Sequence, residues 1–283
     1  MPVLTVYRHG MTAGTPPPTT TKRDAVPRGD VQGWSVGATR RNTAFLRSIR
    51  EDHLDDGPGY ALTLTLRTCP ATPADWQRLR DTWEKRVRRL GMIRMHWVTE
   101  WTRRRVPHLH CAIWFRDAYQ AHKAIQAWLD LTAYDGTTER GQHLALLDHI
   151  VGWFQYMSKH SSRGAKHYQR NPESVPEAWQ KKTGRMWGKS GNWPIQPPVK
   201  VHLDNARGAG DRGYYVYRRI VRGWRVAEAR GSNDWNRVRL ARKMLSSTNR
   251  GLSDVRGVSE WLPYAVNLRV LHHLVNRGLS VTA

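Results

Sequence analysis

The most regular pattern along the chain is an alternation of apolar and hydroxyl residues at positions 60–66, where the sequence runs Tyr-Ala-Leu-Thr-Leu-Thr-Leu. Side chains of a strand point alternately to its two faces, so this segment predicts a strand with one polar face. Two further apolar runs, residues 95–101 and 107–115, predict two more strands. The polar, basic residues 102–106 between them are typical of a short loop, so these strands are expected to form an antiparallel hairpin.

Apolar residues that recur at intervals of three and four predict helices around these strands. The clearest begins at Thr72, an N-cap residue, followed by Pro73 at the first helical position. Its expected buried stripe is Trp76, Leu79, Trp83, Val87 and Leu90. Helices are also expected over residues 42–50, 118–131, 141–161, 213–229, 233–245 and 261–278. Strands separated by helices, next to an antiparallel hairpin, favour an α+β fold in which helices pack on an antiparallel sheet.

His108 and His110 flank a single leucine at the start of the third predicted strand. In a strand they project to one face about 7 Å apart, while Leu109 and Cys111 turn to the other. Two imidazoles in this arrangement are well placed to hold one divalent ion, provided that a neighbouring element supplies a third ligand. The alternative is a half-buried strand in which both histidines are simply hydrogen-bonded.

Glu100 lies near the end of the preceding predicted strand, and the hairpin would bring its carboxylate close to the two imidazoles. A Glu, His and His set forms a plausible Mg²⁺ or Mn²⁺ site. His96 is expected on the same face as Glu100 and is the other candidate for the third ligand. Alternatively, Glu100 is a solvated carboxylate that pairs with the arginines at 103–105.

Tyr156 and Lys159 lie three residues apart in the predicted helix over 141–161, and such a pair shares one helix face. A phenol is a poor nucleophile at neutral pH because its ordinary pKa is about 10. Beside an ammonium group and a metal-polarised phosphate, the phenol can act as a nucleophile. The alternative is an ordinary surface pair on an amphipathic helix.

In this order, the elements resemble the motifs of the HUH endonucleases, the rolling-circle replication initiators of small phages, plasmids and single-stranded DNA viruses. The matching segments are Leu62-Thr63-Leu64-Thr65, Glu100 followed by Pro107-His108-Leu109-His110, and Tyr156 with Lys159. The resemblance covers residues 59–165. A weaker similarity links Gly-Arg-Met-Trp-Gly at 184–188 to a segment that follows the tyrosine helix in phage initiators.

The resemblance implies a five-stranded antiparallel sheet of the ferredoxin-like or RRM-like type, with Glu100, His108 and His110 as ligands of Mg²⁺ or Mn²⁺. It further implies that Tyr156 attacks the scissile phosphate of single-stranded origin DNA, giving a 5′-phosphotyrosyl intermediate and a 3′-hydroxyl for a polymerase. Lys159 would orient or neutralise charge near the phosphate and the tyrosyl oxygen. Family members also rejoin the ends by reversal. The implied setting is the cytoplasm of a bacterial host, with a host helicase and polymerase as partners.

Other members of that superfamily fit less well. Relaxases carry a third histidine with the His-x-His pair, for which only His96 is available here, and the related insertion-sequence transposases are much shorter than 283 residues. Tyr168 lies beyond the usual spacing of paired tyrosines, so a single-tyrosine enzyme is expected. Residues 188–190 read Gly-Lys-Ser, but Thr183 stands where a Walker loop needs glycine, so strand separation is expected to fall to a host enzyme.

The composition agrees with an enzyme that acts on nucleic acid, but it does not distinguish such an enzyme from a non-catalytic basic protein. The chain has 46 Lys and Arg against 23 Asp and Glu, a net charge of +23, which implies salt-sensitive attraction to phosphates. A non-catalytic basic DNA-binding protein, such as a repressor or packaging factor, would show the same balance and remains the alternative function. Two cysteines are too few for a disulfide framework or a zinc cluster, and no apolar run is long enough for a membrane span, so a soluble intracellular protein is expected.

Four regions are expected along the chain. Residues 1–40 are rich in Pro, Thr and basic residues and predict a flexible arm. Residues 41–170, which contain the matching segments, are expected to form the endonuclease domain. Residues 171–198 have no clear periodicity and predict a loop or linker. Residues 199–283 predict a basic helical region, with 16 Lys and Arg against 6 acids from residue 199 onward. That region is expected either to bind duplex origin DNA or to form a helical bundle that braces the catalytic domain.

Overall fold

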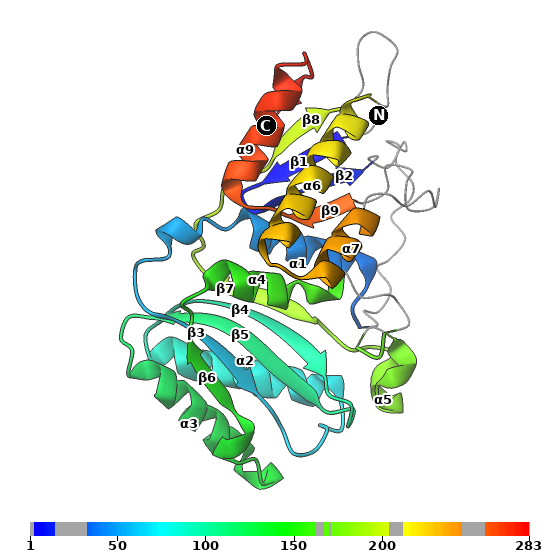
Figure 1. Ribbon diagram of the computed structural model, residues 1–283. Helices are drawn as coiled ribbons and strands as arrows, with labels where there is room; N and C mark the ends of the chain where they lie inside the picture. Colours follow the sequence, from blue (N-terminus) through cyan, green and yellow to red (C-terminus); the bar gives the residue numbers. More distant parts are fainter. Residues whose placement is uncertain are drawn as a thin grey trace, which may run out of the picture. The chain divides into compact units, whose positions relative to one another are not determined.

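The computed structural model describes residues 3–14, 33–161, 167–169, 171–203, 212–244 and 258–282 (Figure 1). The chain forms two compact units. The terminal unit comprises Met1–Asp24 and Gln196–Ala283, and the central unit comprises Ala25–Ile195. Each unit contains an antiparallel five-stranded sheet with helices, which confirms the predicted α+β class.

The central unit is built on the predicted hairpin. Its strands are β3 (Gly59–Leu64), β4 (Met92–Trp101), β5 (Pro107–Phe115), β6 (His143–Leu146) and β7 (Trp187–Gly191), in the spatial order β6-β3-β5-β4-β7. The register of β4 and β5 places Glu100 directly opposite His108. A tight loop joins these strands, closed by a hydrogen bond from Thr102 N to Val106 O of 3.0 Å. The hairpin therefore sets the relative positions of the candidate ligands.

Helices cover both faces of this sheet. They are α1 (Val36–Ser48), α2 (Pro73–Arg89), α3 (Gln120–Thr132), α4 (Ile150–Met157) and the short α5 (Glu177–Gln180). Helix α2 begins as predicted, with Thr72 and Asp75 in a reciprocal capping box and Pro73 in the first turn. Trp83 of α2 and Trp128 of α3 pack edge to face with centroids 6.1 Å apart. Trp76 of α2 donates to Thr99 of β4, so α2 lies on the face that carries the odd-numbered residues. The even-numbered residues lie on the other face, where His96 contacts α1 and His110 contacts α4.

Two predicted elements of the central unit are wrong. The helix expected over 141–161 begins only at Ile150, because the preceding residues His143–Leu146 form β6 and supply hydrogen-bond partners to the edge of β3. The loop expected over 171–198 contains β7, which pairs with β4. Gly188 permits this pairing: a Cβ there would lie only 2.6 Å from the Trp97 ring, so the indole packs over bare backbone.

The terminal unit brings the two ends of the chain into one sheet. Its strands are β1 (Val3–Tyr7), β2 (Gly10–Gly14), β8 (Val199–His202), β9 (Val258–Trp261) and β10 (Val281–Thr282), in the order β10-β8-β1-β2-β9. The prediction of an arm over residues 1–40 is therefore wrong for residues 3–14, whose alternate residues Leu4, Val6, Met11 and Ala13 are buried in a hydrophobic core. It is also wrong for residues 36–40, which form the start of α1 in the central unit. The Pro- and Thr-rich part of that prediction, residues 15–32, lies outside the described residues.

The described part of this unit also contains the helices α6 (Arg212–Gly231), α7 (Trp235–Met244) and α9 (Tyr264–Val275). They confirm the three helices predicted for the carboxy-terminal region, which nevertheless also contributes three strands and so is not solely helical. Val216, Val221, Val266 and Val270 of α6 and α9 belong to the same core as the buried side of β1. Among the described helices, none has the length and apolar character that crossing a membrane requires.

Candidate active site

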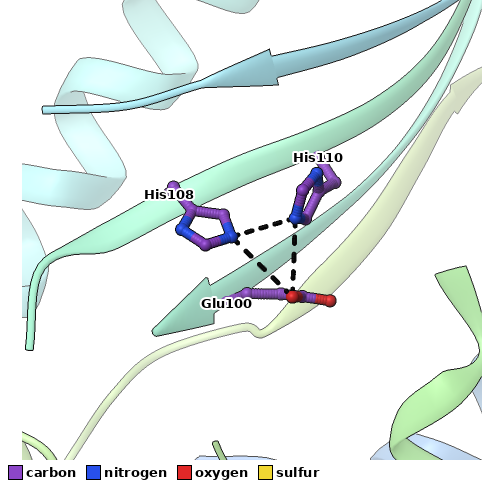
Figure 2. A group of neighbouring side chains, drawn as sticks. All are labelled: Glu100, His108 and His110. Atoms are coloured by element: carbon purple, nitrogen blue, oxygen red, sulfur yellow. Dashed lines mark hydrogen bonds and ion pairs between the residues drawn. The ribbon is translucent and has the colours of Figure 1, made fainter. Parts of the chain in front are cut away.

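Glu100, His108 and His110 converge on one face of the β4–β5 hairpin (Figure 2). The Nε2 atoms of the two histidines lie 2.9 Å apart, and Glu100 Oε2 lies 3.7 Å from that of His108 and 3.4 Å from that of His110. The odd-numbered neighbours Leu109 and Cys111 are fully buried on the other face, as the strand pattern predicts. The structure thus brings together the three residues predicted as ligands.

The donor set fits a divalent ion of the magnesium type. Adjacent ligands of an octahedral ion with bonds of about 2.1 Å lie about 3.0 Å apart, close to the three separations seen here. The buried Nδ1 of His108 has no hydrogen-bond partner among the described residues, and the polar contacts of this imidazole run through Nε2 toward the other two donors. This geometry favours a metal site over the alternative in which both histidines serve the core.

Thr63 of β3 orients the second imidazole. Its Oγ1 lies 2.8 Å from His110 Nδ1 and accepts a hydrogen bond from it, in the assignment that leaves the Nε2 lone pair directed at Glu100 and His108. Burial lowers the pKa of His110, more than Glu100 raises it, so the neutral form that can bind a metal is favoured. Thr63 belongs to the alternating segment 60–66, so the polar face of that predicted strand points at the site.

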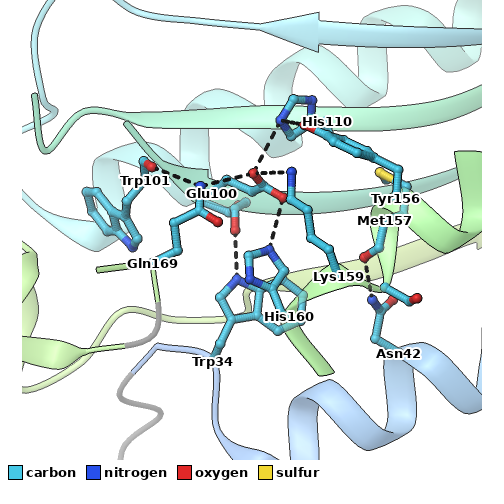
Figure 3. A network of polar contacts seen from close by, with 12 residues as sticks. Trp34, Asn42, Glu100, Trp101, His110, Tyr156, Met157, Lys159, His160 and Gln169 are labelled. Atoms are coloured by element: carbon cyan, nitrogen blue, oxygen red, sulfur yellow. Dashed lines mark hydrogen bonds and ion pairs between the residues drawn. The ribbon is translucent and has the colours of Figure 1, made fainter. Parts of the chain in front are cut away.

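Glu100 is 1% exposed and is held by cations and hydrogen-bond donors on both oxygens. Oε2 accepts from Lys159 Nζ at 2.8 Å and Gln169 Nε2 at 3.3 Å, whereas Oε1 accepts from His160 Nε2 at 2.9 Å (Figure 3). Burial raises the pKa of this carboxyl, but its polar contacts with the three neighbouring histidines outweigh burial and keep the pKa far below its usual range. Glu100 is therefore ionised at any physiological pH, as a metal ligand must be.

Tyr156 reaches the cluster of Glu100, His108 and His110 from the last turn of α4. Its hydroxyl lies 3.3 Å from His110 Nε2, and its side chain is 39% exposed, so the phenol is both close to the cluster and open to a substrate. Lys159, just past the end of α4, places its ammonium 3.5 Å from the centre of the Tyr156 ring. Each of the five residues predicted for the site thus contacts at least one other of them.

Two buried residues fix the end of α4. Asn42 of α1 donates from Nδ2 to Met157 O at 3.0 Å, and its Oδ1 accepts from His96 Nε2 at 2.7 Å. His96 is fully buried, with its pKa lowered to about 3 by burial and by the nearby Lys189. The alternative third ligand of the sequence analysis therefore contacts Asn42, while the three-residue cluster is completed by Glu100.

Comparison with known proteins places this chain in a family. The family model for the replication-associated protein ORF2/G2P matches residues 59–161, a range that includes all five predicted site residues. A protein of Xylella fastidiosa strain 9a5c, whose assignment as a replication protein is provisional, is 52% identical over the full length of both chains. The replication-associated protein G2P of Pseudomonas phage Pf3 is 46% identical over 98% of this chain and 99% of its own. The chain belongs to the replication-associated protein family. No solved structure matches it.

Several contacts in this replication-associated protein were not predicted from its sequence. His160 is 1% exposed and stacks on Trp34 with ring centroids 4.2 Å apart, while Trp34 Nε1 donates to Thr99 O at 3.0 Å. Gln169 reaches Glu100 from the segment 167–169. A usable signal existed for His160, which follows Lys159 and lies four residues after Tyr156. Trp34 and Gln169 reach the site through tertiary structure, and no local spacing reveals them.

The contact between His160 and Glu100 leads to a testable expectation for metal binding. The His160→Phe variant keeps an aromatic ring against Trp34 but removes the donor to Oε1, so the Glu100 carboxylate loses one of the contacts that fix its orientation. Loss of such an outer hydrogen bond typically costs about 10–100-fold in metal affinity, and we expect a loss of this size for Mn²⁺ in isothermal titration calorimetry. His160→Gln, which retains a donor, should recover most of the affinity. Equal Mn²⁺ affinities of wild type and His160→Phe would show that the hydrogen bond does not position Glu100.

Proposed function

We propose that this replication-associated protein nicks and rejoins single-stranded DNA at the replication origin of a phage or plasmid, as an HUH-type endonuclease. The proposal rests on one observation, which is that candidate metal ligands and a candidate nucleophile lie side by side. A Glu-His-His cluster with metal-ligand geometry lies next to an accessible phenol and an ammonium group. The match of residues 59–161 to the replication-associated family supports a role at an origin.

In this proposal Tyr156 is the nucleophile and Lys159 its electrostatic partner. The Tyr156 oxygen forms a bond to phosphorus as the bond to the 3′ oxygen breaks, and the proton lost by the phenol is balanced by one taken up by the 3′ oxygen. Lys159 favours the phenolate and the negative charge on the transferred phosphate. The 5′-phosphotyrosyl bond conserves the energy of the diester, so the reverse reaction rejoins the strand.

Glu100, His108 and His110 would hold Mg²⁺ or Mn²⁺ in this function. When bound, the ion supplies Lewis-acid polarisation of the scissile phosphate. Glu100 contributes the negative charge of the site, Thr63 fixes the ring of His110, and His160 with Gln169 limits the rotation of the carboxylate. A host helicase and polymerase would separate the strands and extend the 3′-hydroxyl.

Metal removal tests the proposal directly. Purified protein is incubated with labelled single-stranded oligonucleotides that tile the parent replicon, in Mn²⁺ or in EDTA. We expect cleavage at one position with Mn²⁺, giving a 3′ end that a polymerase extends, and no cleavage in EDTA. Tight binding without cleavage of any oligonucleotide would instead support the non-catalytic alternative, a repressor or packaging factor. Cleavage that persists in EDTA would show that the reaction does not need the metal ion, which would contradict this part of the proposal.

A further inference from the structure

Helices α6 and α9 of the terminal unit form a groove that has no part in the proposed nicking site. Figure 1 shows the two helices against the sheet of that unit. The groove has a volume of about 570 Å³, within the range of ligand-binding sites. Its walls are one face of each helix. The residues that line it include Arg219, Ile220, Gly223 and Trp224 of α6 with Val266 and Arg269 of α9.

The charge of this groove is unbalanced. Arg219 and Arg269 are exposed, and neither forms an ion pair with a carboxylate among the described residues. No acidic residue lines the groove. Elsewhere on α6, by contrast, Arg225 lies 2.8 Å from Glu260. The guanidinium groups at the groove are thus available to an anionic ligand, and guanidinium binds phosphate with particular geometric fit.

The floor of the groove is apolar and partly aromatic. Ile220 and Trp224 are half-buried, pack against the hydrophobic core and also line the groove. The Arg225 guanidinium lies 4.9 Å from the centre of the Trp224 ring, which shows that this indole already takes part in a stacking contact with a cation. Gly223 lies between them, and a Cβ at this position would meet no atom within 4 Å. An indole beside guanidinium groups is the combination that binds unpaired bases, because the base stacks while the phosphate is neutralised. A duplex keeps its bases within its own stack, so an unpaired strand fits this combination better.

We propose that the groove between α6 and α9 is a second DNA site, which binds single-stranded DNA through phosphates on Arg219 and Arg269 and a base against Trp224. It lies in the unit that lacks Glu100, His108 and His110, and it needs no metal. It goes beyond the proposed nicking function, because it would hold a segment of single strand that is not the scissile one.

Filling the groove tests the proposal with little risk of unfolding. In Gly223→Leu the new side chain occupies open space, and leucine is a better helix former than glycine. The matched control is Gly231→Leu at the end of the same helix, where a Cβ also meets no atom within 4 Å but which does not line the groove. Full-length proteins are titrated in EDTA with a fluorescein-labelled oligothymidylate of roughly 15 nucleotides. We expect about tenfold weaker binding for Gly223→Leu, the value of one stacked base, and wild-type affinity for the control.

Charge reversal tests the phosphate contacts separately. Arg219→Glu with Arg269→Glu should reduce the slope of log affinity against log salt by about 1.4, since each phosphate contact with a single strand contributes about 0.7. The control pair, Arg230→Glu with Arg239→Glu, makes the same change in net charge at exposed positions outside the groove. If both pairs lower the slope and the affinity equally, only the overall charge matters and the proposal is wrong.

Two further readouts identify the ligand class and the site. An iododeoxyuridine-substituted strand should crosslink on irradiation to the peptide that contains Trp224 in wild type, but not in Gly223→Leu. Duplex DNA or polyglutamate that competes with the oligothymidylate equally well per phosphate or carboxylate would assign the groove to another partner and overturn the proposal. These binding assays contain no metal, so their outcome is independent of whether the protein nicks DNA.

Discussion

Replacement of Tyr156 by phenylalanine should abolish both cleavage and covalent attachment while leaving DNA binding nearly unchanged. The substitution removes one hydroxyl from a side chain that is 39% exposed, so neither the core nor the basic surface is altered. Loss of a nucleophile lowers the rate by on the order of 10³-fold or more. The measurement is the yield of denaturation-resistant protein–DNA adduct with Mn²⁺, alongside the affinity for the same oligonucleotide in EDTA.

Tyr168 provides the matched control for this experiment. It is similarly exposed, at 37%, and it contacts His167 and Gln169 rather than the histidine pair. Tyr168→Phe should therefore form adduct at the wild-type level. An adduct that persists in Tyr156→Phe and disappears in Tyr168→Phe would transfer the nucleophile to Tyr168.

Replacement of His110 by alanine should remove metal binding and cleavage together. His110 contributes one of the three donor atoms and is the residue that Thr63 orients, so its loss leaves Glu100 and His108 as an incomplete set. We expect Mn²⁺ affinity to fall by more than the roughly 100-fold that outer contacts can cost. Calorimetric titration with Mn²⁺ measures this without DNA.

His122→Ala is the control for a histidine outside the cluster, because His122 is exposed on α3. It should retain wild-type metal affinity and cleavage. Unchanged cleavage by His110→Ala at the same Mn²⁺ concentration would show that the histidine pair has a structural role, as in the alternative considered from the sequence.

The cluster of Glu100, His108 and His110 was predictable because a hairpin is a local structure. The interval between Glu100 and His108 contains one short loop, and alternation along β5 then fixes the face on which His108 and His110 lie. Tyr156 and Lys159 were found through helical spacing, although Lys159 follows α4 in a short 3₁₀ turn rather than within the helix.

The errors concern short strands whose place in a sheet depends on partners elsewhere in the chain. Residues 3–7 do carry a local strand signal, the run Val-Leu-Thr-Val-Tyr, and β1 and β2 form a hairpin. Their other partners, β8 and β9, are far away in the sequence, with Val3 opposite His202 and Gly10 opposite Trp261, and no local pattern predicts that pairing. β6 is only four residues long, and Leu144 and Leu147, three residues apart, match the helical interval although Leu147 lies just past the strand. β7 contains two glycines and a lysine, a composition typical of a loop, and it becomes a strand because the edge of β4 offers hydrogen bonds and Trp97 covers Gly188.

The most direct test of the central claim is mass-spectrometric localisation of the nucleotide in the adduct that wild-type protein forms with cleaved origin DNA. After protease and nuclease digestion, our account predicts a single modified peptide, with a 5′-phosphonucleotide on Tyr156, formed with Mn²⁺ and absent in EDTA. Attachment at any other residue, or specific cleavage without a covalent intermediate, would contradict it.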